Sequence, residues 1–406
     1  MTDNSNCNQR QTANWLNQHC PCQSLAPAKL PEFAQNFFAP TPLFLSRAQF
    51  ERAEHAISVV QAQIDKPAFQ AKILEKAPKI AKHPVTNAGM FMSYDFHLAE
   101  DQLNLIEINT NAGGAMLVDK LQQAQDICCW EETPLHWPGF DGFVQNMFET
   151  EWTLSGQNRP LTTIAIIDET PKEQFLYEEF QLTANLLADA GYKVLIADPA
   201  DLHWDGQSLL VDGQRIDLVY NRSTDFYLET PTHQALKQAY MADQIVLSPN
   251  PKHHALYASK ANLAYLADTN FLEGLNCSAD EQSLLIDLIQ AQFVTAANAD
   301  ELWAKRKQYF FKPLDGHAGK AVFRGDKVTK KSWAHIVSTP YIAQRNFKPA
   351  LRLTKNESDL TPLKSDLRFY TYRGETFAAA ARLYAGQTTN FRTNGGGFAP
   401  IYITES

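Results

Sequence analysis

The chain has 406 residues, of which 44% are hydrophobic, so it is long enough to bury two or three cores. Its formal charge of -9 argues against a nucleic-acid-binding surface and favours small-molecule partners. No apolar run is long enough to span a bilayer, and the first ten residues lack the basic start and apolar stretch of a secretion signal. We therefore expect a cytoplasmic protein without nucleic-acid or membrane partners.

The first 45 residues are predicted to form a polar N-terminal arm. The six cysteines are too few for a disulfide framework in a chain of this length. Cys7, His19, Cys20 and Cys22 are potential zinc ligands, but they lack the paired spacing of known zinc modules. A flexible arm is therefore favoured over a metal site.

Residues 46–155 are predicted to form helices followed by a β-hairpin. Apolar residues recur at helical spacing from 46 to 83, and alternating strands follow at 91–96 and 103–108. Glu107 and Asn109 alternate onto one face of the second strand, and a carboxylate and an amide oxygen are donors that suit Mg²⁺. The alternative is a polar strand face followed by a glycine turn.

In residues 156–252, strand patterns alternate with helix patterns, and this predicts a small parallel α/β domain. Its strands are expected at 162–167, 193–197, 217–221 and 245–247, its helices at 173–190 and 233–241, and a hairpin at 209–216. Pro249 and Pro251 mark its end. In the last region, 253–406, we expect helices at 260–267, 280–296 and 330–337 and strands at 341–344, 366–373 and 376–384.

Residues 308–323 predict a phosphate-binding hairpin. An aromatic strand leads Lys312 into a turn that contains Gly316 and Gly319, where backbone N–H groups can approach a polyphosphate. Lys312 and Lys320 supply positive charge, and Asp315 can bind Mg²⁺ beside the phosphates. The segment matches neither the P-loop nor the dinucleotide fingerprint, so the pattern indicates a hairpin lid over ATP.

These motifs together resemble a known family. Glu107-Ile-Asn109-Thr resembles the magnesium motif of the ATP-grasp ligases, and the phosphate-binding lysines follow it by more than a hundred residues. That order resembles the circularly permuted branch typified by eukaryotic glutathione synthetase, over most of residues 90–402. The resemblance implies a circularly permuted α+β ATP-grasp fold, of the α/β class, with an inserted small parallel α/β substrate-binding domain at 156–252. Residues 46–155 and 253–406 would form the ATP-grasp part.

The resemblance also implies roles for residues of this sequence. The magnesium ligands would be Glu107, Asn109 and Asp315, with Asp366 and Asn394 as rivals for the third place. The ATP-binding residues would be Lys260, Lys312, Gly316, Gly319, Lys320, Tyr341, Ile342 and Gln344. The substrate-binding residues would be Asp95, Tyr220, Arg222, Arg368, Arg392 and Gly396, and the catalytic residues Arg222, Arg392 and Lys312.

Two positions depart from the pattern of that branch. The branch has an arginine two residues before the aspartate matched to Asp95, whereas this chain has Ser93, so its substrate can differ. The glycine-rich turn is also shorter, and matching Asp315 to the family's third metal carboxylate needs a shift of one residue.

The activity implied is that of an ATP- and Mg²⁺-dependent carboxylate–amine ligase. Such an enzyme transfers the γ-phosphoryl group of ATP to a carboxylate, and an amine then attacks the acyl phosphate to form an amide. Small-molecule acids and amines would be its partners, and the sequence does not identify them. A small-molecule kinase on the same fold and a catalytically inactive nucleotide-binding regulatory protein remain alternatives, and a homodimer is left open.

Overall fold

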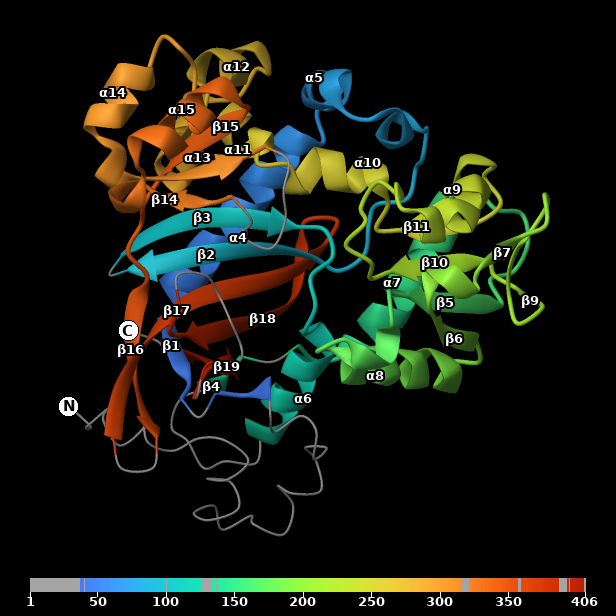
Figure 1. Ribbon diagram of the computed structural model, residues 1–406. Coiled ribbons are helices and arrows are strands. Elements are labelled where there is room, and N and C mark those ends of the chain that lie inside the picture. Colours follow the sequence, from blue (N-terminus) through green and yellow to red (C-terminus); the bar gives the residue numbers. More distant parts are fainter. Residues whose placement is uncertain are drawn as a thin grey trace.

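The computed structural model describes residues 37–39, 41–99, 101–125, 133–135, 137–314, 321–356, 359–386, 393 and 395–404. Figure 1 shows three main bodies: a large central sheet, a small sheet that lies above it in this view, and a parallel sheet with its own helices to the right. None of the helices in these ranges is both long enough and apolar enough to cross a membrane.

The central sheet is antiparallel and has the strand order β19-β18-β17-β2-β3, with β16 paired to β17. The strands are β2 (Met92–Ala99), β3 (Gln102–Asn109), β16 (Ala350–Asn356), β17 (Asp359–Tyr372), β18 (Glu375–Tyr384) and β19 (Gly397–Ala399). The hairpin predicted at 91–108 is confirmed as β2 and β3. Strand β17 begins before the predicted residue 366, and β16 was not predicted.

Alternation gives the central sheet one apolar and one charged face. The apolar face packs on α4 (Arg47–Ile64), in the cluster that holds Phe50, Ile57, Tyr94 and Phe369. Helix α4 begins at a capping box in which Ser46 and Gln49 satisfy each other's backbone N–H groups. The opposite, charged face carries Asp95, Arg368 and Arg382, and it is apolar at one end, where Tyr370, Ala380 and Phe398 pack into a second cluster.

The predicted helices over 46–83 are confirmed as α4, α5 (Pro67–Lys76) and the short η2 (Lys79–Lys82). Residues 43–45, expected in the N-terminal arm, lie in β1 (Leu43–Ser46), which pairs in parallel with β20 (Ile401–Thr404). Strand β4 (Thr133–Pro134) pairs with the other edge of β20, so β1, β20 and β4 form a separate three-stranded sheet. Two helices that were not predicted, α6 (Ala115–Gln125) and α7 (Phe140–Leu154), connect the central and parallel sheets.

The small sheet has the order β12-β15-β13-β14, with β12 (Ala291–Phe293), β13 (Tyr309–Pro313), β14 (Phe323–Arg324) and β15 (Tyr341–Arg345). Pairing of β13 with β14 confirms the predicted strands of the phosphate hairpin. The helix expected at 280–296 is α13 (Ala279–Ile289) and ends early, because Gln290 adopts a left-handed conformation and the chain then enters β12. Other helices here are α11 (Ala261–Tyr265), α12 (Thr269–Gly274), α14 (Ala299–Ala304) and α15 (Lys330–Ser338).

The parallel sheet has the order β11-β10-β5-β6, which confirms the predicted parallel α/β unit. Its strands are β5 (Thr163–Ile167), β6 (Lys193–Ala197), β10 (Leu218–Asn221) and β11 (Val246–Ser248), with helices α8 (Tyr177–Asp189) and α9 (Gln234–Met241). The strands β7 (His203–Trp204), β8 (Leu209–Val211) and β9 (Gln214–Arg215) form a peripheral sheet that contains the predicted hairpin. Helix α10 (Pro251–His253) and the π-helical turn η6 (His254–Ala258) lead from this unit to the small sheet.

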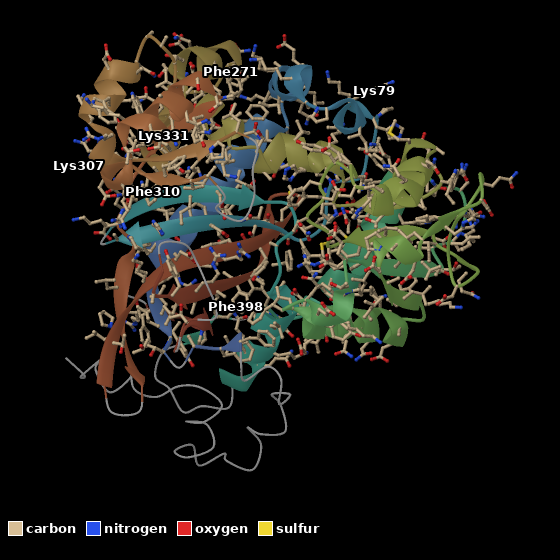
Figure 2. The ribbon with its side chains drawn as sticks, viewed as in Figure 1. Lys79, Phe271, Lys307, Phe310, Lys331 and Phe398 are labelled. Carbon is tan, nitrogen blue, oxygen red and sulfur yellow. The ribbon has the colours of Figure 1, made fainter. Side chains whose placement is uncertain are left out.

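Side chains follow the expected division between core and surface. In Figure 2 the lysines Lys79 and Lys307 lie at the outer edge of the molecule, and these two and Lys331 are exposed. Phe398 on β19 is fully buried in the cluster that joins the central sheet to α6 and α7.

Candidate active site

The charged face of the central sheet meets the small sheet at Lys312. Its Nζ atom donates to the backbone oxygen of Ile106 on β3 at 3.1 Å and to Oε1 of Gln344 on β15 at 2.6 Å. Lys312 is only 9% exposed, and this burial lowers its pKa to about 8. The negative charge of Glu107 acts in the other direction and raises the pKa of Lys312, but burial outweighs it. Lys260 lowers the pKa further by repulsion. The structure therefore brings Lys312, Lys260 and Glu107 together, although they lie far apart in the sequence.

Glu107 and Asn109 present oxygen atoms on the same strand face, as expected from their spacing. The amide nitrogen of Asn109 donates to Oδ2 of Asp95 at 3.1 Å and lies 3.5 Å from Oε1 of Glu107. This orientation, assigned from the hydrogen bonds, leaves Oδ1 of Asn109 and Oε2 of Glu107 without a donor in the described part of the chain. One carboxylate oxygen and one amide oxygen with spare lone pairs fit a Mg²⁺ ion that takes its remaining ligands from phosphates and water.

Asp95 is at the centre of a buried ion-pair network. Its carboxylate accepts hydrogen bonds from Arg368 at 2.6 and 2.8 Å and from Arg382 at 2.8 Å. Arg382 also donates to Asp366 at 2.6 Å. Burial alone would raise the pKa of Asp95, but Arg368 and Arg382 outweigh it and lower the pKa. Asp95 and Asp366 therefore hold the two arginines in place on the sheet face.

Ser93, which stands where the resemblance leads one to expect an arginine, donates from Oγ to Asp95 at 3.2 Å. The neighbouring strands β17 and β18 supply Arg368 and Arg382 to the same carboxylate. In this network, Arg368 and Arg382 thus take the place of the arginine that the resemblance leads one to expect on β2.

Arg222 lies at the end of β10 and contacts the loop that follows β3. Its Nη1 donates to Oδ1 of Asn111 at 2.6 Å and to the hydroxyl of Tyr220 at 3.3 Å, and its Nη2 lies 4.0 Å from Glu179. Tyr220 is buried. Glu179 accepts hydrogen bonds from the backbone N–H groups of Gly114 at 2.7 Å and Met116 at 3.3 Å, so it caps the start of α6. Burial raises the pKa of Glu179.

Three of the predicted ATP-binding residues lie inside the small sheet. Tyr341, Ile342 and Gln344 are buried on β15, which has β12 on one side and β13 on the other. The side chain of Gln344 joins the two sheets, because its Nε2 donates to the Leu105 oxygen of β3 at 2.8 Å while its Oε1 accepts from Lys312.

The predicted site residues within 315–320 and 392–396 are only partly among the described residues. Gly396 is buried, and a Cβ atom there would lie 2.6 Å from the Leu383 oxygen of β18. Only glycine allows this close approach of two backbone segments. The other predicted positions in the two loops lie outside the described residues: Asp315, Gly316, Gly319, Lys320, Arg392 and Asn394.

Two groups near these residues were not predicted. His97 on β2 is half-buried, its Nε2 lies 3.2 Å from the Tyr384 hydroxyl, and burial lowers its pKa to about 4. Asp168 directly follows β5, and burial raises its pKa to about 6, against the lowering effect of Arg222. A polar residue directly after the apolar strand 163–167 was the available signal for Asp168.

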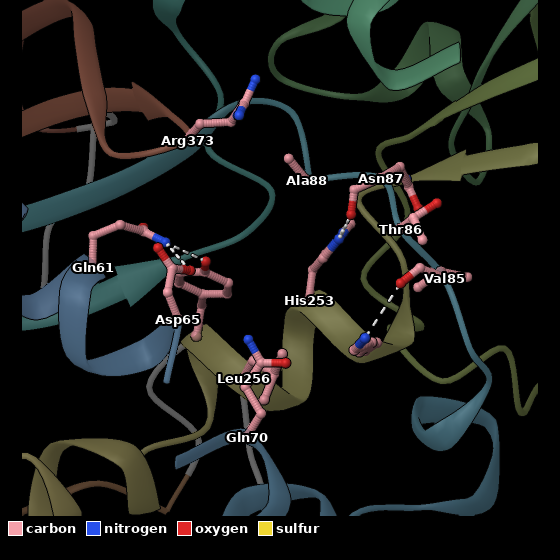
Figure 3. A pocket seen from close by; sticks show the side chains of 12 residues that line it. Gln61, Asp65, Gln70, Val85, Thr86, Asn87, Ala88, His253, Leu256 and Arg373 are labelled. Carbon is pink, nitrogen blue, oxygen red and sulfur yellow. Dashed lines mark hydrogen bonds between the residues drawn. The ribbon is translucent and has the colours of Figure 1, made fainter. Parts of the chain in front are cut away.

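A polar hollow of about 360 Å³ lies elsewhere, between the end of α4, residues 85–88 and the α10–η6 segment. Figure 3 shows its lining, which includes Gln61, Asp65, Asn87, Lys252, His253 and Arg373. None of the residues predicted for ATP, metal or substrate lines it, so it is distinct from the meeting point of the two sheets.

Comparison with solved structures bears on the fold. A glutathione synthetase-like effector from Globodera pallida, solved in the apo form, is 13% identical, and the match covers 95% of this chain and 100% of that chain with a TM-score of 0.61. The chain has a circularly permuted ATP-grasp-like fold. This is consistent with its strand order, in which β3 with Glu107 and Asn109 precedes β13 with Lys312.

Other likenesses are weaker. A putative gamma-glutamylcysteine synthetase from Methylobacillus flagellatus is 11% identical over 88% of each chain, and its TM-score of 0.47 is too low to support an inference. The same holds for D-alanyl-alanine synthetase A from Vibrio cholerae, which is 13% identical over 58% of this chain and 78% of that chain with a TM-score of 0.31. No protein-family model matches the sequence, and a search of curated proteins found no match.

Proposed function

We propose that this protein is an ATP- and Mg²⁺-dependent ligase that joins a small-molecule carboxylate to an amine. The observation that carries the proposal is the convergence of Lys312, Lys260, Glu107 and Asn109 where the small sheet meets the central sheet. Two ammonium groups lie near one carboxylate there, and burial together with repulsion from Lys260 lowers the pKa of Lys312, so a negatively charged ligand would stabilise its protonated form. A polyphosphate with its magnesium ion supplies the negative charge and the oxygen ligands that this set of residues can accept.

Each residue has a separate part in this proposal. Lys312 uses two of its three N–H donors within the protein, which leaves the third for a phosphate oxygen. Glu107 and Asn109 would hold Mg²⁺ through their unoccupied oxygens. When bound, Mg²⁺ neutralises phosphate charge as the γ-phosphoryl group moves to the substrate carboxylate.

The arginines would bind the substrates. Arg368 and Arg222 both contact the loop after β3: Arg368 Nη1 donates to the Gly113 oxygen at 3.4 Å, and Arg222 donates to Asn111. A planar guanidinium suits a carboxylate and an acyl phosphate. The glycine-containing loops at 316–319 and 395–397 are proposed to exclude water from the acyl phosphate, which would otherwise hydrolyse.

The likeness to the Globodera pallida protein supports the fold on which this proposal depends, and the reaction is our inference from the residues. The test is ADP release by the purified protein with Mg-ATP, challenged with γ-glutamylcysteine plus glycine and with sets of amino acids, dipeptides and polyamines. Mass spectrometry then identifies the product. We expect substrate-dependent ADP release and a product lighter than the two substrates by one water.

Other outcomes would support the alternatives. A phosphorylated product would indicate a kinase, and Mg-ATP binding without turnover would indicate a regulatory protein. Lys312→Ala is expected to weaken nucleotide binding by about tenfold or more, whereas the matched substitution of the exposed Lys307→Ala leaves it unchanged. If wild-type protein does not bind Mg-ATP, the proposal is wrong.

A further inference from the structure

The polar hollow beside the end of α4 lies outside the proposed ligase site. It is bounded by α4, residues 85–88 and the α10–η6 segment, and its volume of about 360 Å³ is enough for a small organic ligand. The turn between β17 and β18 closes one side of it. A Cβ atom at Gly374 would lie 2.9 Å from Cγ of Gln61, so this turn packs tightly on α4 and holds the neighbouring Arg373 at the hollow.

Hydrogen bonds fix much of the lining before any ligand binds. Gln61 Nε2 donates to the Tyr257 hydroxyl at 2.7 Å and to Oδ1 of Asp65 at 2.8 Å. His253 Nε2 donates to the Asn87 oxygen at 2.8 Å, and burial lowers the pKa of His253, so its ring is neutral at pH 7. Figure 3 shows Gln61 and Asp65 on one side of the hollow and His253 and Asn87 on the other. These walls are therefore preformed.

Three charged side chains of the lining have unused hydrogen-bonding capacity. Asp65 accepts only the bond from Gln61, so its Oδ2 has no donor among the residues that the structure describes. The guanidinium of Arg373 makes no hydrogen bond or ion pair with any described residue, and Lys252 donates once, to the Val85 oxygen at 3.3 Å. Partial burial raises the pKa of Asp65, against the lowering effects of Gln61 and Arg373. Arg373 thus lies near Asp65 without pairing with it.

The charge around the hollow favours an anion. Arg373 and Lys252 outnumber Asp65 in the lining. Beside the hollow, α5 packs on η6 and η2 packs on α10, and these two elements expose three lysines, Lys76, Lys79 and Lys82. Their positive charge attracts anions. Since Asp65 repels an anion, the ligand also needs a hydrogen-bond donor for that carboxylate.

We propose that the hollow binds a small dicarboxylate that carries a hydroxyl or ammonium group. One carboxylate pairs with Arg373 and the other with Lys252, while the hydroxyl or ammonium group donates to Asp65. Arg373 is exposed and Lys252 is half-buried, so both long side chains have room to adjust to the ligand. This site goes beyond the proposed ligase activity and does not depend on it, since none of the residues predicted for ATP, metal or substrate lines it.

The test is binding measured by calorimetry without ATP. Aspartate, malate and succinate are the probes, because they share a four-carbon dicarboxylate skeleton and differ in one group: an ammonium, a hydroxyl or a hydrogen. We expect the better of aspartate and malate to bind about tenfold or more tightly than succinate, which offers Asp65 no donor. Absence of binding by both, or equal binding by succinate, would overturn the inference.

Variants localise the effect. Arg373→Asn removes the cation, and asparagine tolerates the left-handed backbone at this position, where φ is 53°. We expect this variant to lose about tenfold in affinity for the better probe. Asp65→Asn keeps an oxygen for Gln61 but replaces Oδ2 with a donor, so the preference over succinate should disappear while succinate itself binds at least as tightly as to wild type. Retained succinate binding shows that the variant is folded.

The matched controls are Asp189→Asn and Arg215→Asn. Both residues are exposed and belong to the parallel α/β unit, and neither lines the hollow. Their substitution should leave the affinity for each probe within about twofold of wild type. An unchanged affinity in Arg373→Asn, or an unchanged preference in Asp65→Asn, would overturn the inference.

The result is separable from the proposed ligase activity. Because the titration contains no ATP, it can succeed where ADP release fails, and fail where ADP release succeeds. Repeating it with saturating Mg-ATP tests the location of the site, and we expect the better probe still to bind. Competition by Mg-ATP would place the probe in the ligase site and overturn the inference.

Discussion

The pKa of Lys312 provides a direct test of what its ammonium group contacts. Near pH 8 about half of these lysines are neutral in the free protein, because burial lowers the pKa to about 8. A phosphate oxygen beside the ammonium group favours the protonated form. We therefore expect Mg-ATP binding to take up protons, to an extent that grows as the pH rises from 7.5 to 9. Calorimetry in two buffers of different ionisation enthalpy measures this uptake.

The control for this measurement is Lys312→Met, which keeps most of the side-chain volume and removes the titrating group. Residual binding by this variant should occur without proton uptake in the same pH range. Uptake that persists in the variant would assign the proton to another group.

Asp168 is expected to reduce stability at neutral pH. Burial raises its folded-state pKa to about 6, while the unfolded-state value stays near 3.9. Well below pH 4 the carboxyl is protonated in both states, so it has no effect. Between about pH 4 and pH 6 it ionises in the unfolded state while burial keeps it protonated in the folded state, so stability falls across this window and then stays at the lower value above pH 6. Since part of the group contacts solvent, we expect Asp168→Asn to raise the free energy of unfolding by about 1 to 2 kcal/mol at pH 7.5.

The measurement is urea denaturation at pH 7.5 and pH 4. The gain should vanish at pH 4, and Asp198→Asn should show no gain at either pH, because both oxygens of Asp198 accept backbone N–H groups. Charged neighbours of Asp168 are Arg222, Glu169 and Asp198, and their effects also require an ionised Asp168. A gain that is independent of pH would therefore mean that the charge of Asp168 is not its cause. A carboxylate that reduces stability is better explained by ligand binding than by folding.

At the scale of elements, Glu151 connects α7 to the chain that enters β2. Its buried carboxylate accepts from Asn87 Nδ2 at 2.9 Å, from the backbone N–H of Ala88 at 2.8 Å and from that of Gly89 at 3.1 Å. Tyr372 at the end of β17 donates to it at 3.0 Å. Glu151→Gln places an N–H₂ group against these donors, and we expect a loss of about 2 to 4 kcal/mol in urea denaturation.

The matched control is Glu149→Gln, two residues earlier on the same helix. Glu149 is half-buried and accepts from the Tyr192 hydroxyl and from Gln145 on the same helix. Its substitution should change stability by less than 1 kcal/mol. Equal losses for the two variants would show that the segment at 87–89 is held by other contacts.

The same scale shows what the sequence could predict. The hairpin with Glu107 and Asn109 and the parallel sheet were predicted, because each has a local alternating or strand–helix–strand pattern. The early end of α13 was not, since only its pairing partner β15 makes residues 291–293 a strand. Asp168 and the arginine network around Asp95 were missed for a similar reason: their roles depend on which strands are neighbours, and periodicity does not give strand order.

At the scale of the whole molecule, β20 is the central strand of the sheet β1-β20-β4. Its residues Ile401 and Tyr402 are fully buried. A chain truncated after Pro400 would leave β1 and β4 without a common partner and expose the apolar face under them. We expect such a chain to lose its cooperative thermal transition, whereas truncation after Thr404 preserves it. Calorimetric melting distinguishes the two, and a normal transition after Pro400 would contradict this role of β20.

The pairing of β1 with β20 also affects how the protein is made. The hydrogen bond from Thr404 Oγ1 to the Leu45 oxygen joins residues 359 positions apart. Strand β1 is synthesised long before its partner β20. It is partly apolar, and it stays unpaired until the intervening chain has been synthesised. The nascent chain therefore exposes the edge of β1 until β20 has been made. We expect chaperones that bind extended segments to bind it during this time.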